Sequence, residues 1–285
     1  LQPILRGDEV WCQLFSEPGA GSDLASLGTR AVRDGDDWIV NGQKVWTSFG
    51  QFADYAILLA RTDIDSPKHA GITYFILDMK TPGIEVRPIT QITGVQHFNE
   101  VFLSDVRIPH SNVLGEVHGG WKVAQTTLSN ERSHIGSGGG SWTVPQLIEL
   151  AKARGANTDP RVRQGLAQAH ARAETLRYLG LRMRTAMSQL RMPGPEMLTL
   201  KLAFANHWRI TADLAAEIVG AGAMLWDGDA PEHNQWGQQL LSQFAIRIGG
   251  GTDEIQRNII AERGLGLPRE PQNDKDLPWR SLTKS

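Results

Sequence analysis

The stretch that decides the fold of the second half of the chain runs from residue 158 to 190 and reads TDPRVRQGLAQAHARAETLRYLGLRMRTAMSQL. Asp159 is a good N-cap, and Pro160 is a good first helical residue. Apolar residues then recur in alternating steps of four and three, the period of one helix face. They are Val162, Leu166, Ala169, Ala173, Leu176, Gly180, Met183, Met187 and Leu190. The pattern predicts a long helix of a helical bundle.

Three more helices are predicted around this one. One runs from Gly120 to about Ala153, and another begins near Leu198 after a Pro-Gly-Pro break. The apolar stripe of the latter is Leu198, Leu202, Ala205, Ala212, Ala216 and Val219. The last helix follows the glycine run at residues 249–251. Four helices are the number that a simple bundle needs.

Before this region the period is close to two, which is typical of strands. Residues 38–46 place Asn-Gly between two short apolar runs, which predicts a hairpin with a type I′ turn. Further short β-branched or aromatic runs lie at 55–60, 72–77, 84–89 and 99–103. The chain is therefore expected to be an α+β multidomain protein. An antiparallel, barrel- or sandwich-like β-domain over residues 1–118 precedes a helical domain over residues 119–285.

Composition narrows the possible partners. The 285 residues are 40% hydrophobic and 21% charged, with a formal net charge of −2, so no global field attracts nucleic acid or an acidic membrane. No apolar run approaches the roughly 18 to 20 residues that span a bilayer. One cysteine, Cys12, excludes an internal disulfide and a multi-thiolate metal site, and it fits a reducing, cytoplasmic compartment. No metal site is expected.

Four short segments could carry chemistry, and each has a plainer explanation. Residues 16–23 form a small-residue loop able to approach a ligand, although most such loops are only tight turns. Residues 249–252 open a helix with free N–H groups that suit an anion, and an ordinary cap by Thr252 explains them equally well. Residues 46–48, Trp-Thr-Ser, suit a planar heterocycle with polar edges, although a Trp in a β-domain is more often core. Glu131 and Arg132 lie in a helical pattern, where an acid is usually solvated or ion-paired.

In combination, the order and wording of these segments resemble the acyl-CoA dehydrogenase family of flavoproteins. The matching blocks are FSEPGAGSD (15–23), NGQKVWTS (41–48), NEVFLSDVRIP (99–109), LGEVHGGW (114–121) and GGTDEIQRNIIAER (250–263). The family fold has an N-terminal helical domain, a middle β-domain and a C-terminal four-helix domain. The resemblance implies that this chain begins near the β-domain and that the family's N-terminal domain is absent from it.

The resemblance also implies site residues. Positions matched to FAD contacts are Gln13, Phe15, Ser16, Trp46, Thr47, Ser48, Thr252 and Glu254. Positions matched to the thioester or CoA are Ser22, Ser129, Arg132 and Gly251. Many relatives carry the catalytic base as the Glu of a Tyr-Glu-Gly-Thr stretch, which here reads Gly249-Gly250-Gly251-Thr252. Isovaleryl and long-chain dehydrogenases instead place it immediately before the Arg of the earlier helix, which is Glu131 here.

The implied reaction is α,β-dehydrogenation of an acyl-CoA thioester, an oxidoreductase step of lipid metabolism and fatty-acid β-oxidation. Glu131 would take the α-proton, FAD would accept the β-hydrogen as hydride at flavin N5, and an electron-transferring flavoprotein would reoxidise the FAD. The family implies a dimer or homotetramer. Two alternatives stay open: one subunit of a heteromeric dehydrogenase acting on bulky branched or steroid side-chain thioesters, and a non-catalytic structural partner.

Two family motifs on the adenosine side of FAD are missing. The usual Arg-x-x-Phe-Gly is replaced by residues 145–149, PQLIE, and Gln-x-x-Gly-Gly appears only as EIVGA at 217–221. An arginine of the segment 154–191 could substitute, although a solvated basic face is the favoured interpretation. The sequence gives neither acyl-chain length nor the choice between homo- and hetero-oligomer.

Overall fold

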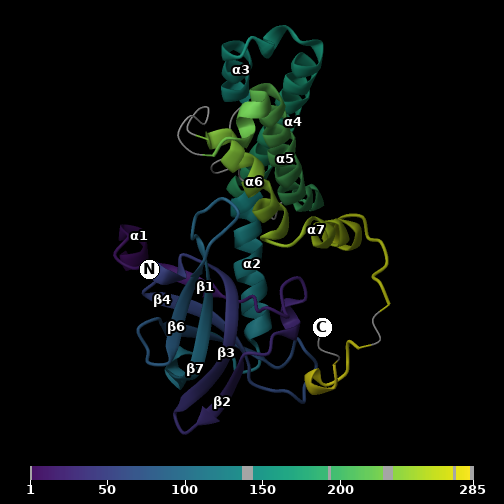
Figure 1. The fold of residues 1–285 in the computed structure, drawn as a ribbon. Helices are drawn as coiled ribbons and strands as arrows, with labels where there is room; N and C mark the ends of the chain where they lie inside the picture. The colour runs from purple at the N-terminus through teal and green to yellow at the C-terminus, as the bar shows by residue number, and fades with distance from the viewer. Residues whose placement is uncertain (1, 137–143, 192–193, 227–233, 272–273, 283–285) are drawn as a thin grey trace. The chain divides into compact units, whose positions relative to one another are not determined.

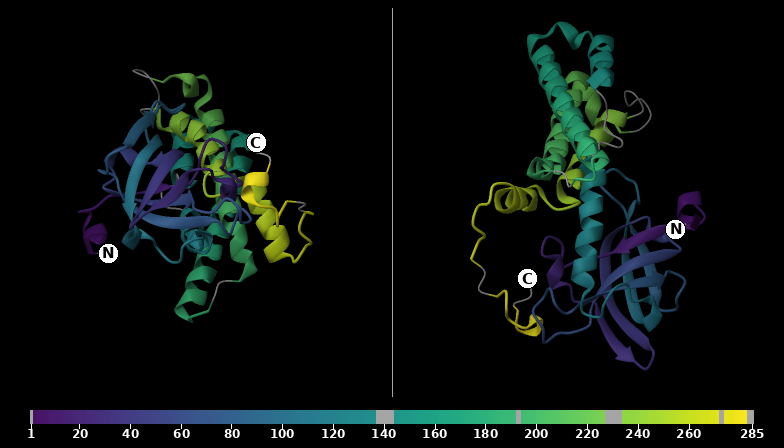
Figure 2. Two further views of the ribbon diagram at one scale, coloured as in Figure 1. Left: turned by 90° about the horizontal axis from the view of Figure 1, so that it is seen from below. Right: turned by 180° about the vertical axis from the view of Figure 1, so that it is seen from behind.

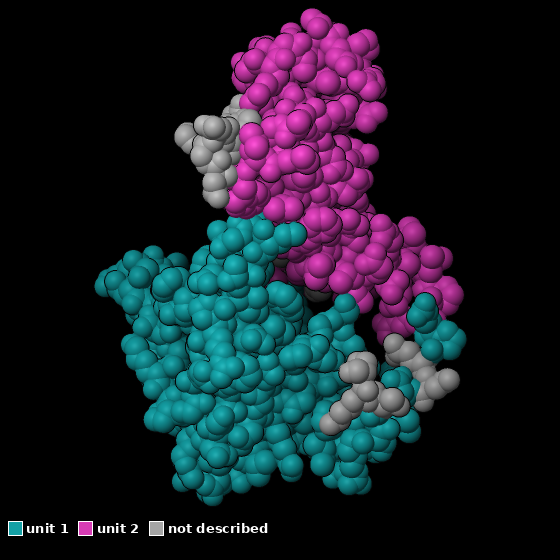
Figure 3. Space-filling model, in the orientation of Figure 1, with its two compact units in different colours: residues 1–128, 270–285 teal, residues 129–269 magenta. Residues whose placement is uncertain are grey.

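The computed structural model describes residues 2–136, 144–191, 194–226, 234–271 and 274–282. The chain divides into two compact units, of which unit 1 contains residues 1–128 and 270–285 and unit 2 contains residues 129–269 (Figure 3). None of the helices in the described ranges has the length and apolar character that a membrane span requires.

Unit 1 is built on a seven-stranded mixed sheet (Figure 1). Its elements are α1 (Gln2–Arg6), β1 (Trp11–Leu14), β2 (Arg30–Asp34), β3 (Asp37–Ser48), β4 (Tyr55–Arg61), β5 (Ile72–Asp78), β6 (Ile84–Ile89) and β7 (Phe98–Pro109). The strand order is β1-β4-β2-β3-β7-β6, with β5 paired to β4. The predicted β-domain is confirmed, but the sheet is not antiparallel throughout, because β1 pairs with β4 in parallel.

The predicted hairpin at Asn41-Gly42 is wrong. Residues 37–48 form one continuous strand, β3, which pairs with β7 on both sides of Gly42 through a register shift. The tight turn lies earlier, at Gly35 (φ 60°), between β2 and β3. A Cβ at Gly42 would lie 2.7 Å from the Cα of Thr29, so glycine serves a close backbone approach instead of a turn.

The core of unit 1 lies on the two faces of this sheet. One cluster contains alternating residues of β3 and β7, among them Trp38, Val40, Val101 and Leu103. The other cluster contains Phe15, Tyr74 and Ala124, and Ala124 comes from the beginning of α2 (Gly120–Gly136). Helix α2 therefore starts packed against the sheet.

Unit 2 is helical, as predicted. After the end of α2 come α3 (Val144–Ala153), α4 (Pro160–Ser188), α5 (Leu200–Val219), α6 (Gln235–Ile248) and α7 (Asp253–Ile259), and α5 contacts α3, α4 and α6 (Figure 2). The predicted cap is confirmed, because the Asp159 side chain accepts from the Arg161 N–H at 2.8 Å. The sequence-based prediction of four helices after residue 119 is too low, because the described residues there form the six helices α2 to α7. Two helices occupy the segment 120–153, and the glutamine-rich α6 lacked a clear apolar stripe.

The apolar stripe of α4 is buried only in its first half. Val162 and Ala169 are buried, Val162 in a cluster with residues of α3 and α5, whereas Leu176, Gly180 and Met183 are half-buried and Met187 is exposed. Only Ala205 and Ala212 of the predicted α5 stripe are buried, and the buried face also includes Phe204, Leu214 and the polar Lys201.

Candidate active site

The loop after β1 is the first part of the candidate site in unit 1. Phe15 is buried against Tyr74 in an edge-to-face contact with ring centroids 5.8 Å apart. The carbonyl of Ser16 accepts from the Val45 N–H at 2.9 Å. This bond joins the loop to β3, one residue before Trp46. Gln13 lies half-buried on β1, and Ser22 is exposed farther along the loop.

A buried ion pair lies under this loop, and sequence reasoning missed it. The Lys44 side chain is 0% exposed, and its Nζ donates to Glu17 Oε1 at 2.8 Å and to the Phe15 carbonyl at 3.0 Å. The Glu17 carboxylate also accepts from the backbone N–H groups of Gly28 (2.6 Å) and Thr29 (2.9 Å). Burial by itself would raise the pKa of the Glu17 carboxyl, but Lys44 and the donated hydrogen bonds hold that pKa below 4.5.

The far end of the loop is held by Arg61. This buried guanidinium donates to the carbonyls of Ala25 at 2.5 Å and Lys68 at 2.7 Å. The Trp279 ring lies 5.0 Å from the guanidinium carbon, and Trp279 Nε1 donates to the Ser26 carbonyl at 3.2 Å. The C-terminal segment of unit 1 thus closes over this end of the loop.

Residues 46–48 form the second part of the site in unit 1. Trp46 is 59% exposed and has a left-handed backbone (φ 63°), so the interpretation of Trp46 as a core residue is wrong. Among the aromatic rings of the described residues, the Trp46 ring packs only against Phe98, in a T-shaped contact with ring centroids 5.9 Å apart. Thr47 is buried, and its Oγ1 has no hydrogen-bond partner among them, while Ser48 is exposed.

Unit 2 carries the remaining predicted residues. Ser129 and Glu131 lie on α2, where Ser129 is exposed and Glu131 is half-buried. The backbone of Arg132 belongs to the same helix, and its side chain lies outside the described residues. Glu254 is exposed on α7 and makes an ion pair with Arg257 at 3.4 Å.

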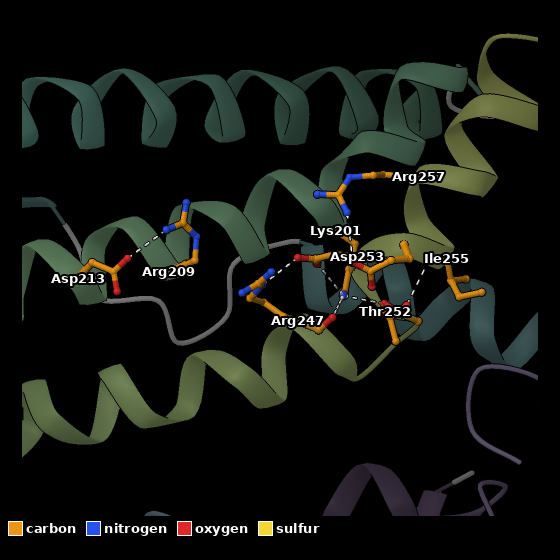
Figure 4. Close-up of polar contacts among 10 residues, drawn as sticks. Lys201, Arg209, Asp213, Arg247, Thr252, Asp253, Ile255 and Arg257 are labelled. Atoms are coloured by element: carbon orange, nitrogen blue, oxygen red, sulfur yellow. Dashed lines mark hydrogen bonds and ion pairs between the residues drawn. The ribbon is translucent and has the colours of Figure 1, made fainter. Parts of the chain in front are cut away.

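The turn of residues 249–252 is fixed by a polar cluster (Figure 4). Thr252 is the N-cap of α7, and its Oγ1 accepts from the Ile255 N–H at 3.3 Å. Asp253 is buried and accepts from Arg247 Nε at 2.9 Å. Lys201 Nζ donates to the Gly251 carbonyl at 2.7 Å. Phe244, Arg247, Ile248, Thr252, Asp253 and Glu254 line a small pocket beside this turn.

The predicted residues therefore form two groups. Gln13, Phe15, Ser16, Ser22 and residues 46–48 belong to unit 1, and Ser129, Glu131, Arg132 and residues 251–254 belong to unit 2. Lys44 and Lys201 were missed, although each carried a signal. Lys44 has the same strand parity as the apolar Trp38 and Val40, and Lys201 precedes the predicted core residue Ala205 by one helical turn.

Family models match both halves of the chain. The middle domain of acyl-CoA dehydrogenases matches residues 12–106, and their C-terminal domain matches residues 118–265. The chain belongs to the acyl-CoA dehydrogenase family. Members of this family are flavin-dependent oxidoreductases that act on acyl-CoA thioesters.

This family member is similar to mycobacterial proteins. It is 42% identical over 266 residues to acyl-CoA dehydrogenase IpdE1 of Mycobacterium tuberculosis, covering 92% of this chain and 68% of the relative. FadE34 of the same organism is 41% identical over 93% of this chain and 36% of its own length. Among solved structures, the Tcur3481-Tcur3483 steroid ACAD is 33% identical (TM-score 0.85; 94% of this chain, 71% of that one). The ChsE4-ChsE5 complex from Mycobacterium tuberculosis is 32% identical (TM-score 0.81; 94% and 72%).

The residues of unit 1 fit the cofactor of this family. Trp46 offers a flat exposed ring, Ser48 is exposed, and the buried hydroxyl of Thr47 has no hydrogen-bond partner in the part of the chain that the structure describes. These features suit a planar heterocycle with hydrogen-bonding edges. No group of three or more His, Cys, Asp or Glu side chains in the described ranges is arranged to hold a metal ion.

Proposed function

We propose that this family member catalyses α,β-dehydrogenation of an acyl-CoA thioester, with Glu131 as the base. Glu131 takes the proton from Cα, the pair of electrons left there forms the Cα=Cβ double bond, and the β-hydrogen departs with its own electron pair. Bound FAD supplies the acceptor for that hydrogen, and Trp46, Thr47 and Ser48 hold its ring system.

The observation that supports this assignment is that residues 249–254 offer no acid suited to be the base. Gly250 stands where many relatives carry the base, and its φ of 66° disfavours any side chain there. Asp253 is committed to Arg247, and the exposed Glu254 pairs with Arg257. Glu131, half-buried on α2, is the family's other position for the base.

The test is Glu131→Gln, which keeps the size of the side chain and removes its basic oxygen. FAD and ligand binding should persist, while flavin bleaching by substrate falls by at least the roughly 10² to 10⁴ of general-base catalysis. Adding Gly250→Glu should restore only part of the rate, because the backbone at Gly250 strains a side chain. Wild-type bleaching by the single variant would disprove the role of Glu131.

A second candidate is one subunit of a heteromeric dehydrogenase for bulky or steroid thioesters. The missing adenosine-side motifs support it, and so does the similarity to two pairs of proteins, the Tcur3481-Tcur3483 steroid ACAD and the ChsE4-ChsE5 complex. The exposed apolar side chains in the second half of α4, Tyr178, Leu181 and Met187, support association in either case, as a homo-oligomer or with a partner chain. We further propose an electron-transferring flavoprotein as the acceptor of electrons.

Purification with and without a co-encoded partner separates these candidates. A homo-oligomer should be yellow after reconstitution with FAD alone, and a heteromeric subunit only with its partner. A protein that stays colourless in both cases would favour the non-catalytic alternative. A thioester panel with an artificial electron acceptor then determines the acyl group.

A further inference from the structure

The backbone of the turn before α7 has an unusual conformation. Gly250 and Gly251 have successive positive φ angles of 66° and 91°. Only glycine adopts such a pair without strain. Because glycine can adopt many other backbone conformations as well, contacts from outside the turn are needed to hold this one.

Both glycine carbonyls have such contacts. Gln256 Nε2 donates to the Gly250 carbonyl at 2.9 Å, and Lys201 Nζ donates to the Gly251 carbonyl at 2.7 Å. Gln256 lies on α7, close to the turn in sequence, whereas Lys201 comes from the first turn of α5. Lys201 is therefore the contact that ties the turn to a different helix.

The lysine is an unexpected residue for this position, because it is only 2% exposed. Burial lowers the pKa of its ammonium below 10.5, although the charges of Asp253 and Glu254 oppose that effect. Asp253 Oδ1 lies 3.9 Å from Nζ, and Asp253 is itself 2% exposed. A neutral side chain would avoid the cost of burying this charge pair.

What a lysine adds is three donors on one atom. Its Nζ donates to the carbonyl of Gly251 in the turn (2.7 Å) and to the carbonyl of Arg247 at the end of α6 (3.5 Å), and it lies at the ion-pair distance of 3.9 Å from the Asp253 carboxylate at the start of α7. The side chain of Arg247 also donates to the Asp253 carboxylate, at 2.9 Å. One buried atom thus joins α5, α6, the turn and α7 (Figure 4).

We propose that Lys201 is a positioning residue that fixes the peptide orientation of the Gly250–Thr252 turn for binding of FAD and the thioester. Because Lys201 is 2% exposed and donates to the Gly251 carbonyl, we expect it to act through the turn and not by direct contact with a ligand. The assignment rests on the proposed function, because that function gives Gly251 and Thr252 their ligands.

The experiment compares Lys201→Met, which keeps most of the length of the side chain without its donors, with Lys201→Met/Asp253→Asn, which also removes the negative charge that faces Nζ. Arg209→Met is the matched control, because it breaks an ion pair on the same helix at Asp213 (3.1 Å) whose side chains are 40% and 49% exposed. Amide hydrogen exchange is followed in the peptide covering 250–257, where the Ile255 and Gln256 N–H groups bond to Thr252.

Both Lys201 variants should exchange roughly tenfold faster in this peptide without FAD, the change expected for loss of a charge-assisted hydrogen bond. FAD Kd and KM for an acyl-CoA should rise, with a smaller change in kcat. Arg209→Met should match the wild type in each measurement. If Lys201→Met alone fails to fold, the double variant supplies the result.

Wild-type exchange and wild-type FAD affinity in the double variant would overturn the assignment. The outcome for the proposed base is separate. If Glu131→Gln keeps full activity while the Lys201 variants loosen the peptide, the base is wrong and the support of the turn by Lys201 stands.

Discussion

In unit 1 the Nζ of Lys44 donates to the carbonyl of Phe15, and in unit 2 the Nζ of Lys201 donates to the carbonyl of Gly251. Both lysines are buried, and both hold backbone that the family resemblance associates with ligand binding. They differ in their acidic partners. Glu17 lies 2.8 Å from Lys44, whereas Asp253 lies 3.9 Å from Lys201.

The two carboxylates also differ in the hydrogen bonds that they accept. Glu17 accepts from Lys44 and from two backbone N–H groups, whereas Asp253 Oδ1 has no hydrogen bond among the described residues. A buried pair whose hydrogen bonds are all made holds its surroundings rigid and is costly to break, whereas a pair with an unsatisfied oxygen leaves the neighbouring backbone easier to displace. We therefore expect disruption of the Lys44 pair to destabilise unit 1 as a whole and disruption of the Lys201 pair to act mainly on its turn.

The largest expected effect is on the pair in unit 1. Glu17→Gln leaves the Lys44 ammonium buried without an anion and should lower the free energy of unfolding by about 3 to 5 kcal/mol. Adding Lys44→Met should recover much of that loss. Urea unfolding of the four proteins of the double-mutant cycle measures the coupling. Additive losses would show that the pair is not a unit.

Replacing the exposed Trp46 should change FAD affinity but not the stability of the fold. Trp46→Ala should weaken FAD by about 1 to 3 kcal/mol, roughly 5- to 150-fold in Kd, if the exposed ring stacks on the flavin. Because the side chain is largely exposed, the unfolding midpoint should hardly change. Flavin retention on dilution and thermal unfolding measure the two quantities, and an unchanged Kd would contradict the stacking role.

Trp279 tests the other end of the loop in unit 1. Trp279→Ala removes the ring over Arg61 and the bond to Ser26, and should destabilise this region by about 1 to 2 kcal/mol. Trp279→Phe keeps a ring and should lose about half as much. Limited proteolysis of residues 270–282 reports the release of the segment, and equal cleavage of all three proteins would argue against the clamp.

Acidification should produce the smallest change. The folded-state pKa of Glu17 lies below its usual 4.5, so its contribution to stability is present above pH 4.5 and is lost as the pH falls through the folded value. The wild type should therefore lose stability below pH 4.5 more steeply than Glu17→Gln. Unfolding midpoints measured at several pH values would show parallel slopes if Glu17 made no contribution.

Local patterns in the sequence were enough for much of the fold and for the family. Short β-branched or aromatic runs predicted β4, β5 and β6, and the period of about 3.6 together with Asp159 and Pro160 predicted α4. These features depend on neighbours a few residues away, so one sequence contains them. The motif order that carries the resemblance is likewise read directly along the chain.

Local patterns did not determine which strands pair, because pairing depends on strands far apart in the chain. Asn41-Gly42 is a strong local turn signal, yet both flanks of Gly42 pair with β7, and the gain from a long ladder exceeds the preference for a turn. Sequence order likewise could not show that Trp46 is exposed, because its environment depends on strands distant in the chain.

The sequence by itself determined the periods of the helices and most strands, the cap of α4 and the set of candidate ligand contacts. Only the tertiary structure decided that Lys44 and Lys201 are buried and hold those contacts in place. The physical reason is separation, because Lys44 reaches Glu17 across 27 residues and Lys201 reaches Gly251 across 50. A buried charge is stable only beside partners that folding brings to it.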